Sequence, residues 1–176
     1  MSVVIDGTLG INTIQDNTVS PSKTTGLLDV IQIVTSQVGT VATGTTIIPF
    51  DNTIPQITEG TEFMTVTITP TSASSTLEID VTTYSSHSVG NFNASALFQD
   101  STANALAVGA GYSSVATGMV PVRFTHYMTA GTTSPTTFRV RIGNSGAGTL
   151  TFNGTGGVQT FGGVFASRIT VKEYRA

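Results

Sequence analysis

The chain has 176 residues, a net charge of −3 and no cysteine. That length suits one domain with a sizeable core, and the lack of cysteine excludes disulfide frameworks, thiolate metal sites and cysteine nucleophiles. Charged residues make up only 10%, and hydroxyl groups replace them in 33 Thr and 17 Ser. Thr suits pleated strands and Ser suits turns, so the composition predicts an all-β protein. We expect neither a signal peptide nor a membrane span, because no long uninterrupted apolar run occurs.

Residues 1–40 contain few apolar positions and many turn formers. Such a segment cannot bury enough surface to fold alone, so it either stays loose or pairs with copies of itself or with a partner. One part of it, residues 27–34, has enough apolar side chains to pack, and its β-branched residues favour a strand over a short helix. We therefore predict two parts, an N-terminal segment over 1–40 and a β-sandwich over 41–176.

In the second part, apolar and polar residues alternate in short runs separated by turn residues, which is typical of a sandwich. In 76–82 the alternation points Leu77, Ile79 and Val81 inward and two acidic side chains outward. Strands are predicted in the same way over 46–50, 62–69, 76–82, 94–98, 120–128, 136–142, 149–152 and 165–174.

Charge is divided unevenly along the chain. Residues 1–122 have a balance of −8, and residues 123–176 have a balance of +5. A basic C-terminal third can indicate nucleic-acid binding. The basic residues are spread singly with few aromatic residues between them, so we favour acidic and basic strands lying side by side, with no nucleic-acid partner.

Several short sequence motifs resemble those of the C-terminal domains of bacteriophage fibre and virion proteins. Such domains are relatives of the jelly roll of tumour-necrosis-factor and complement head groups. The opening Val4-Ile-Asp-Gly-Thr-Leu-Gly-Ile is similar to the start of phage tail-fibre proteins, where such segments attach to the particle. The other motifs are Glu62-Phe-Met-Thr-Val-Thr-Ile-Thr, Thr76-Leu-Glu-Ile-Asp-Val, Ala96-Leu-Phe-Gln-Asp, Arg123-Phe-Thr-His-Tyr-Met and Ser167-Arg-Ile-Thr-Val-Lys-Glu-Tyr.

The resemblance implies a jelly-roll sandwich that assembles as a homotrimer, with the strands starting near Thr76, Thr136 and Phe165 in one inner sheet. Combined with the alternation, it predicts a ladder of opposite charges near the threefold axis. The ladder consists of Glu78 and Asp80 between Arg139 and Arg141 on one side and Arg168 and Lys172 on the other.

No catalytic or metal site and no cofactor is expected. The chain has two histidines, His87 and His126, and neither belongs to a recognisable motif. The carboxylate pairs Glu59/Glu62 and Glu78/Asp80 are the candidates for a glycosidase, which requires an acid with a raised pKa. Arginine neighbours would keep Glu78 and Asp80 ionised, so we predict that the protein is not an enzyme.

The resemblance implies a virion structural protein, a trimeric short tail fibre that contacts other virion proteins through its N-terminal segment and a host glycan or protein through its outer loops. A capsid decoration protein and a small polysaccharide-active spike domain stay open as alternatives. With both termini at one end, the loops near 84–93, 129–136 and 153–163 are expected to face outward. The candidate receptor-binding residues in them are His87, Asn91, Phe92, Thr132, Gly156 and Gly157.

Overall fold

The computed structural model describes residues 29–176, so most of the expected attachment segment lies outside the described residues. Within them the chain forms strands and one short 3₁₀ turn, η2, at Phe161–Gly163. The strands are β1 (Val30–Val38), β2 (Ala42–Gly44), β3 (Thr61–Ile68), β4 (Thr76–His87), β5 (Phe92–Gln99), β6 (Ala107–Tyr112), β7 (Val120–Thr129), β8 (Thr136–Asn144), β9 (Leu150–Phe152), β10 (Gly154–Thr155), β11 (Val158–Gln159) and β12 (Ser167–Tyr174).

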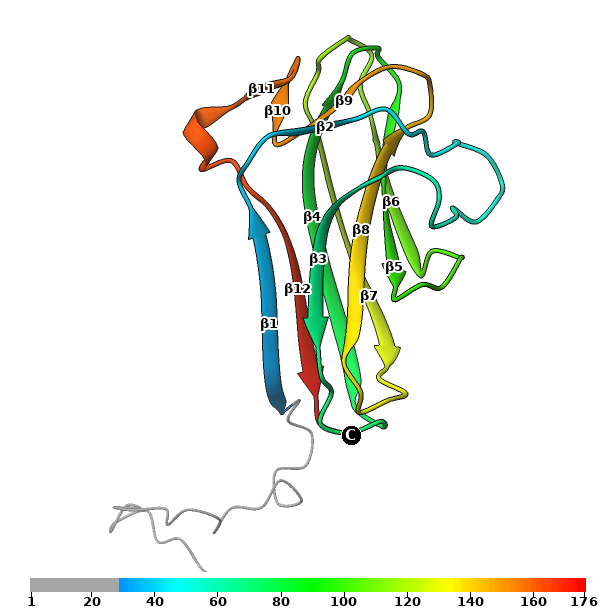
Figure 1. The fold of residues 1–176 in the computed structure, drawn as a ribbon, viewed down its shortest axis with the longest axis vertical. Coiled ribbons are helices and arrows are strands. Elements are labelled where there is room, and N and C mark those ends of the chain that lie inside the picture. The colour runs from blue at the N-terminus through cyan, green and yellow to red at the C-terminus, as the bar shows by residue number, and fades with distance from the viewer. Residues whose placement is uncertain (1–28) are drawn as a thin grey trace, which may run out of the picture.

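The long strands form two antiparallel sheets packed face to face (Figure 1). The first sheet has the order β1-β12-β4-β7, and the short strands β9 and β2 extend it beyond the upper part of β4. The second sheet has the order β3-β8-β5-β6. The chain crosses between the sheets in the sequence of a jelly roll, which confirms the predicted all-β sandwich.

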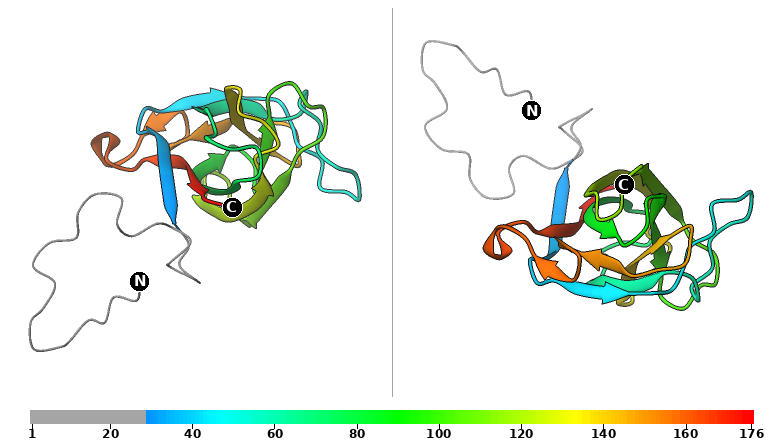
Figure 2. Two further views of the ribbon diagram at one scale, coloured as in Figure 1. Left: turned by 90° about the horizontal axis from the view of Figure 1, so that it is seen from below. Right: turned by 90° about the horizontal axis from the view of Figure 1, so that it is seen from above.

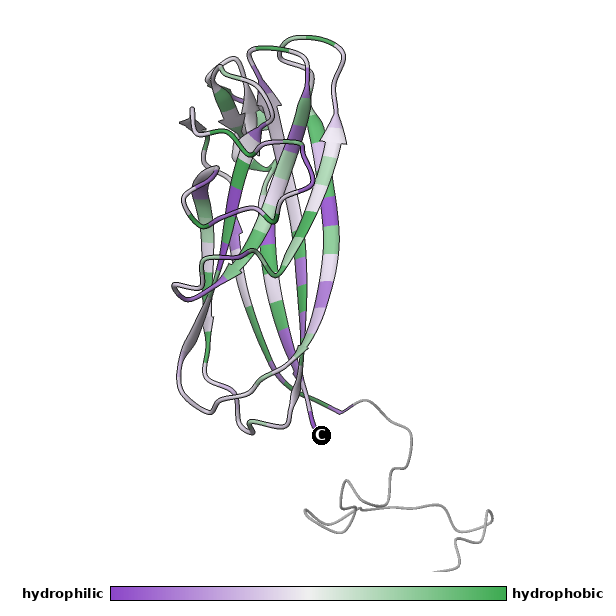
Figure 3. Ribbon diagram, turned by 90° about the vertical axis from the view of Figure 1, so that its right-hand side faces the viewer, coloured by the Kyte–Doolittle hydropathy of each residue, from purple (hydrophilic) through white to green (hydrophobic). Residues whose placement is uncertain are grey.

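The core lies between the two sheets and follows the predicted alternation, which is visible as alternating colours along the strands in Figure 3. Leu77, Ile79 and Val81 of β4 are fully buried, as predicted, and they face the inward side chains of β8 in the opposite sheet. The buried residues contributed by β8 are Phe138, Val140 and Ile142. Each such side chain contributes about 1.5–3 kcal/mol when it leaves water.

β1 pairs along its length with β12, so residues 30–38 belong to the sandwich, although the sequence pattern places them in the N-terminal segment. Residues 27–34 were favoured as a strand, and those from Val30 onward are one. Residues 46–50 do not form a strand. They run across the outward side of the second sheet, where Ile48 packs on Ala94, Ala96 and Phe98 of β5.

β6 was not predicted, because its sequence alternates alanine, valine and glycine rather than polar and apolar residues. Its glycines are required by the packing of the sheet edges. A Cβ at Gly109 would lie 2.8 Å from Val122 of β7, and one at Gly111 would lie 2.5 Å from Val120. The absence of these side chains lets β6 and β7 close one edge of the sandwich.

The first and last described residues lie at the same end, where the backbone N–H of Arg175 donates to Asp29 at 3.0 Å. The 129–136 loop lies there too, since the N–H of Ala130 donates to the carbonyl oxygen of Ser75. The prediction that this loop, with Thr132, faces away from the attachment end is therefore wrong. β7 runs antiparallel to β4, so β7 ends where β4 begins. The far end holds the 88–91 turn, which is part of the predicted 84–93 loop, and the 153–157 turn, which is part of the predicted 153–163 loop, whereas residues 84–87 belong to β4.

Candidate functional site

An ion cluster occupies the outward face of the first sheet. Register places Lys172 of β12 beside Glu78 of β4, and the two side chains pair at 2.6 Å. Lys172 also lies 3.5 Å from Asp80, and the Tyr174 hydroxyl donates to Glu78 at 2.7 Å. Two hydrogen bonds lower the pKa of Glu78 to about 2, and the one from Lys172 has a larger effect than the one from Tyr174. Glu78 is therefore ionised at neutral pH and is not suited to donate a proton to a leaving group.

Glu78, Asp80 and Lys172 lie together as the charge ladder requires, but Arg139 and Arg141 do not, and the place of the ladder near a threefold axis stays a prediction. β8 pairs with β3 and β5, so its arginines lie on the outward face of the second sheet, across the sandwich from Glu78. The alternation of β8 showed that its arginines point away from the core, but it did not show which sheet contains β8.

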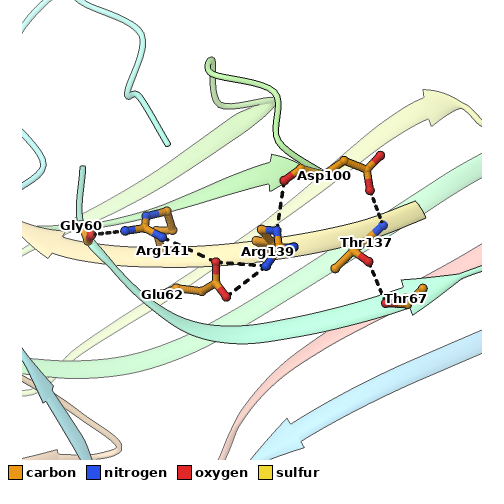
Figure 4. Close-up of polar contacts among 7 residues, drawn as sticks. All are labelled: Gly60, Glu62, Thr67, Asp100, Thr137, Arg139 and Arg141. Carbon is orange, nitrogen blue, oxygen red and sulfur yellow. Dashed lines mark hydrogen bonds and ion pairs between the residues drawn. The ribbon is translucent and has the colours of Figure 1, made fainter. Parts of the chain in front are cut away.

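On the second sheet, the two arginines share one carboxylate (Figure 4). Arg139 lies 3.2 Å from Glu62 and Arg141 lies 3.5 Å from it. Arg139 also donates to the carbonyl oxygen of Asp100, and Arg141 donates to that of Gly60 at 2.9 Å. These bonds fix the loops around β3 and β5 to β8, which is a structural role within one chain.

Two residues of the predicted receptor set meet in a polar hollow at the far end. Gly156 and Gly157 form the β10–β11 turn, and both have a positive φ, of 57° and 80°. With Ser88, Thr149 and Thr151 they line a pocket of about 280 Å³. Hydroxyl groups and glycine backbone in a concave surface can offer hydrogen bonds to an uncharged polar ligand.

The remaining predicted residues of the far end lie in separate environments. The ring of His87 is buried, and its Nδ1 lies 3.2 Å from the backbone N–H of Val89. The side chain of Asn91 accepts a hydrogen bond from the backbone of Phe92. The ring of Phe92 stacks on Phe50 at 3.9 Å and meets Tyr112 at 4.9 Å.

The two histidines do not come together. His126 pairs in register with Ile79, eight residues before His87 on β4, which is about 26 Å along a strand. Burial lowers the pKa of His126. Within residues 29–176, no three His, Asp or Glu side chains are grouped as metal ligands. No helix in the same range is long and apolar enough to cross a membrane.

The sequence pattern did not reveal an apolar pocket of about 460 Å³ between the 48–55 segment and the sheet edge formed by β5 and β6. Its lining includes four alanines, Phe50 and the 53–55 turn. The residues that line this apolar pocket are Ile48, Pro49, Phe50, Asp51, Thr53, Ile54, Pro55, Ala94, Ala105, Leu106, Ala107, Val108 and Ala110.

The sequence pattern also missed the role of Asn153, whose fully buried side chain joins three parts of the first sheet. Its Nδ2 donates to the carbonyl oxygen of Val38 at 2.7 Å. Its Oδ1 accepts from the backbone of Ser167 at 3.1 Å and from the Ser167 hydroxyl at 2.6 Å. Asn153 thus holds both ends of the 154–166 excursion against β1 and β12.

A family model described as the Pgp3 C-terminal domain matches residues 45–176. None of the curated proteins matches the chain. Among solved structures, the chain is similar to the enzymatically active domain of tailspike protein 4 of bacteriophage CBA120, at 16% identity and a TM-score of 0.27. That match covers 70% of this chain and 19% of the tailspike chain, and a likeness of this size carries no argument about fold or activity. Because the family model spans most of the sequence, including all strands from β3 to β12, the chain belongs to the Pgp3 C-terminal domain family.

Proposed function

We propose that this protein is a trimeric, non-enzymatic head module of a bacteriophage fibre, which attaches the particle to a host surface. The observation that carries the proposal is the contrast between the outward faces of its two sheets. The 45–60 segment of the chain itself covers the β5 side of the second sheet. The outward residues of β1 and β7 on the first sheet, such as Ile33 and Tyr127, are exposed beside the ion cluster.

A sheet face that carries apolar side chains and a tight ion cluster is a suitable surface for another protein chain. Because the chain resembles the trimeric jelly rolls of fibres and head groups, we take its partners to be two further copies of this chain. In this arrangement the outward face of the first sheet lies near the threefold axis. The end with residues 29 and 175 faces the particle, and the pocket lined by Gly156, Gly157 and Thr151 faces outward.

Replacing Lys172 by glutamate is expected to abolish the trimer. The substitution leaves Glu78, Asp80 and a third carboxylate together on the interface face, and these like charges repel one another in each of three copies. The mass of the variant in solution, measured by light scattering after size-exclusion chromatography, should be that of one chain. Circular dichroism checks that the variant is folded.

Arg139→Glu is the matched control, because it reverses one charge on the outward face of the second sheet. The control should keep the mass of the trimer. A folded K172E protein that stays trimeric, or an R139E protein that becomes monomeric, contradicts the assignment of the interface to the first sheet.

Electron microscopy of whole virions, with an antibody against this chain, tests the role itself. Trimers confined to the tail agree with a receptor-binding fibre and make the far-end loops the candidates for host contact. Trimers spread over the head lattice identify a capsid decoration protein and exclude the receptor-binding role. A particle without the chain excludes both structural roles.

A further inference from the structure

A short apolar protrusion, residues 158–164, projects beyond the edge of the first sheet. Its side chains are among the most exposed apolar groups of the described chain, with Val158 at 66%, Phe161 at 74% and Val164 at 85% exposure. Phe161 meets Phe165 at 5.9 Å, and Phe165 packs on Tyr84 of β4 at 4.2 Å. The protrusion is therefore continuous with the outward face of the first sheet.

The backbone of the protrusion is in an unusual conformation. Phe161 has a φ of 51°, and Gly162 and Gly163 follow at 61° and 88°. A bulky side chain is unfavourable in the left-handed region, because its Cβ crowds the backbone there. An exposed Phe161 gains little from burial within its own chain that would offset this cost. Such outliers are typical of sites that contact a ligand or a partner.

The apolar pocket is the complementary feature on the other side of the molecule. In Figure 1 the protrusion lies at the left of the sandwich and the segment that covers the pocket lies at the right, both in the upper half. Both views in Figure 2 keep the two features on opposite sides. A knob and a hollow on opposite sides of one chain allow a head-to-tail contact, which closes into a ring when the rotation between copies permits.

The charges beside the protrusion and the pocket are also complementary. Arg168 follows the protrusion on β12 and is exposed, and Asp51 is exposed at the apolar pocket. Among residues 29–176, neither side chain takes part in an ion pair. Hydrogen bonds from Thr53 lower the pKa of Asp51, so it carries a negative charge at neutral pH. A copy that places its protrusion in the pocket can bring Arg168 toward the Asp51 of its neighbour.

We infer that the protrusion of one copy inserts Phe161 and Val164 into the apolar pocket of the next copy around the trimer. The contact is heterologous, so each copy gives one protrusion and receives one. It rests on the trimer proposed above, and it adds a second contact to the one made by the outward face of the first sheet. The volume of the pocket also suits a small ligand, but in this arrangement the protrusion of the next copy fills it.

Disulfide trapping tests the contact in a chain that has no cysteine of its own. The double variant Ile54→Cys with Val164→Cys places one thiol on the wall of the pocket and one on the protrusion, both at exposed positions. After mild oxidation, a non-reducing gel should show linked species up to three chains. A disulfide forms only when the two Cα atoms come within about 7 Å, so linkage reports a specific contact.

Two controls separate this contact from random collision. Ile54→Cys with Val115→Cys moves the second thiol to another exposed residue, in the β6–β7 loop, and should stay unlinked. Val164→Cys alone should also stay unlinked, because each protrusion meets a pocket and not another protrusion. Linkage of that single variant contradicts the head-to-tail contact.

The mass of each variant in solution separates failure of this contact from failure of the trimer. A trimer in which the double variant I54C/V164C stays unlinked overturns the contact between the protrusion and the pocket and leaves the trimer in place. A wild-type chain that is monomeric overturns the trimer and this contact with it.

Discussion

Replacing Asn153 by alanine is expected to lower the free energy of unfolding by about 3–5 kcal/mol, one of the two largest single-residue effects that we predict. The substitution removes the donor to Val38, in a partly buried setting, and the acceptor for two groups of Ser167, in a buried one. It also places alanine at a φ of 53°, a conformation that asparagine tolerates better. Urea denaturation followed by circular dichroism measures the loss.

The variant Asn153→Gly separates the two causes, because glycine accepts a positive φ but makes no side-chain hydrogen bond. N153G is expected to be about 1 kcal/mol more stable than N153A and still well below the wild type. If N153G is as stable as the wild type, the hydrogen bonds to Val38 and Ser167 contribute nothing and the proposed role of Asn153 is wrong.

Replacing Glu173 by alanine is expected to cost about 3 kcal/mol. This carboxylate is fully buried on the inward side of β12. Its Oε1 accepts hydrogen bonds from the backbone and the hydroxyl of Thr71, both at 2.8 Å, and from the backbone of Ser72 at 3.4 Å. Without it, buried donors in the 70–75 turn lose their acceptor, and the turn between β3 and β4 loosens.

The same carboxylate makes stability depend on pH. Burial raises the pKa of Glu173, but hydrogen bonding to the 71–75 turn, with Ser75 and Thr71 contributing most, outweighs burial and holds this pKa below its ordinary value. The folded state therefore binds this proton less readily than the unfolded state does. The stabilisation is complete above the ordinary pKa of glutamate, about 4.3, and is lost as the pH falls through the folded pKa.

Glu173→Gln tests this dependence, because glutamine keeps the shape of the side chain and does not titrate. The difference in unfolding free energy between the wild type and E173Q should be largest at neutral pH and should shrink steadily below about pH 5. Glu78 loses its own contribution between the ordinary pKa of glutamate and its folded pKa of about 2, but E173Q leaves Glu78 unchanged, so this loss is the same in both proteins and cancels in the difference. A difference that stays constant from neutral pH to about pH 3 would falsify the account of Glu173.

The sequence pattern predicted most of the sandwich because a period of two is a local property. The inward positions of β4, β8 and β12 follow directly from it, and the inward series Ile169 and Val171 continues to Glu173. The same pattern says nothing about which strands become neighbours. Arg139 and Arg141 were therefore placed on the correct side of their strand but in the wrong sheet.

The candidate sites were harder to predict, because they depend on contacts between distant segments. Phe92 was recognised as an aromatic residue near the far end, but its stacking on Phe50 depends on the path of the 46–60 segment across the second sheet. The hydrogen bond from Asn153 to Val38 likewise joins residues 115 positions apart. Such pairings are invisible to a short-range pattern.

The central claim is that the chain works as a trimer, and native mass spectrometry of the full chain tests it most directly. One chain has a mass of 18.2 kDa. We expect a dominant species of three chains, which K172E converts to single chains and R139E leaves intact. A wild-type protein that stays at the mass of one chain across the micromolar range would contradict the proposed trimeric head and the contacts inferred within it.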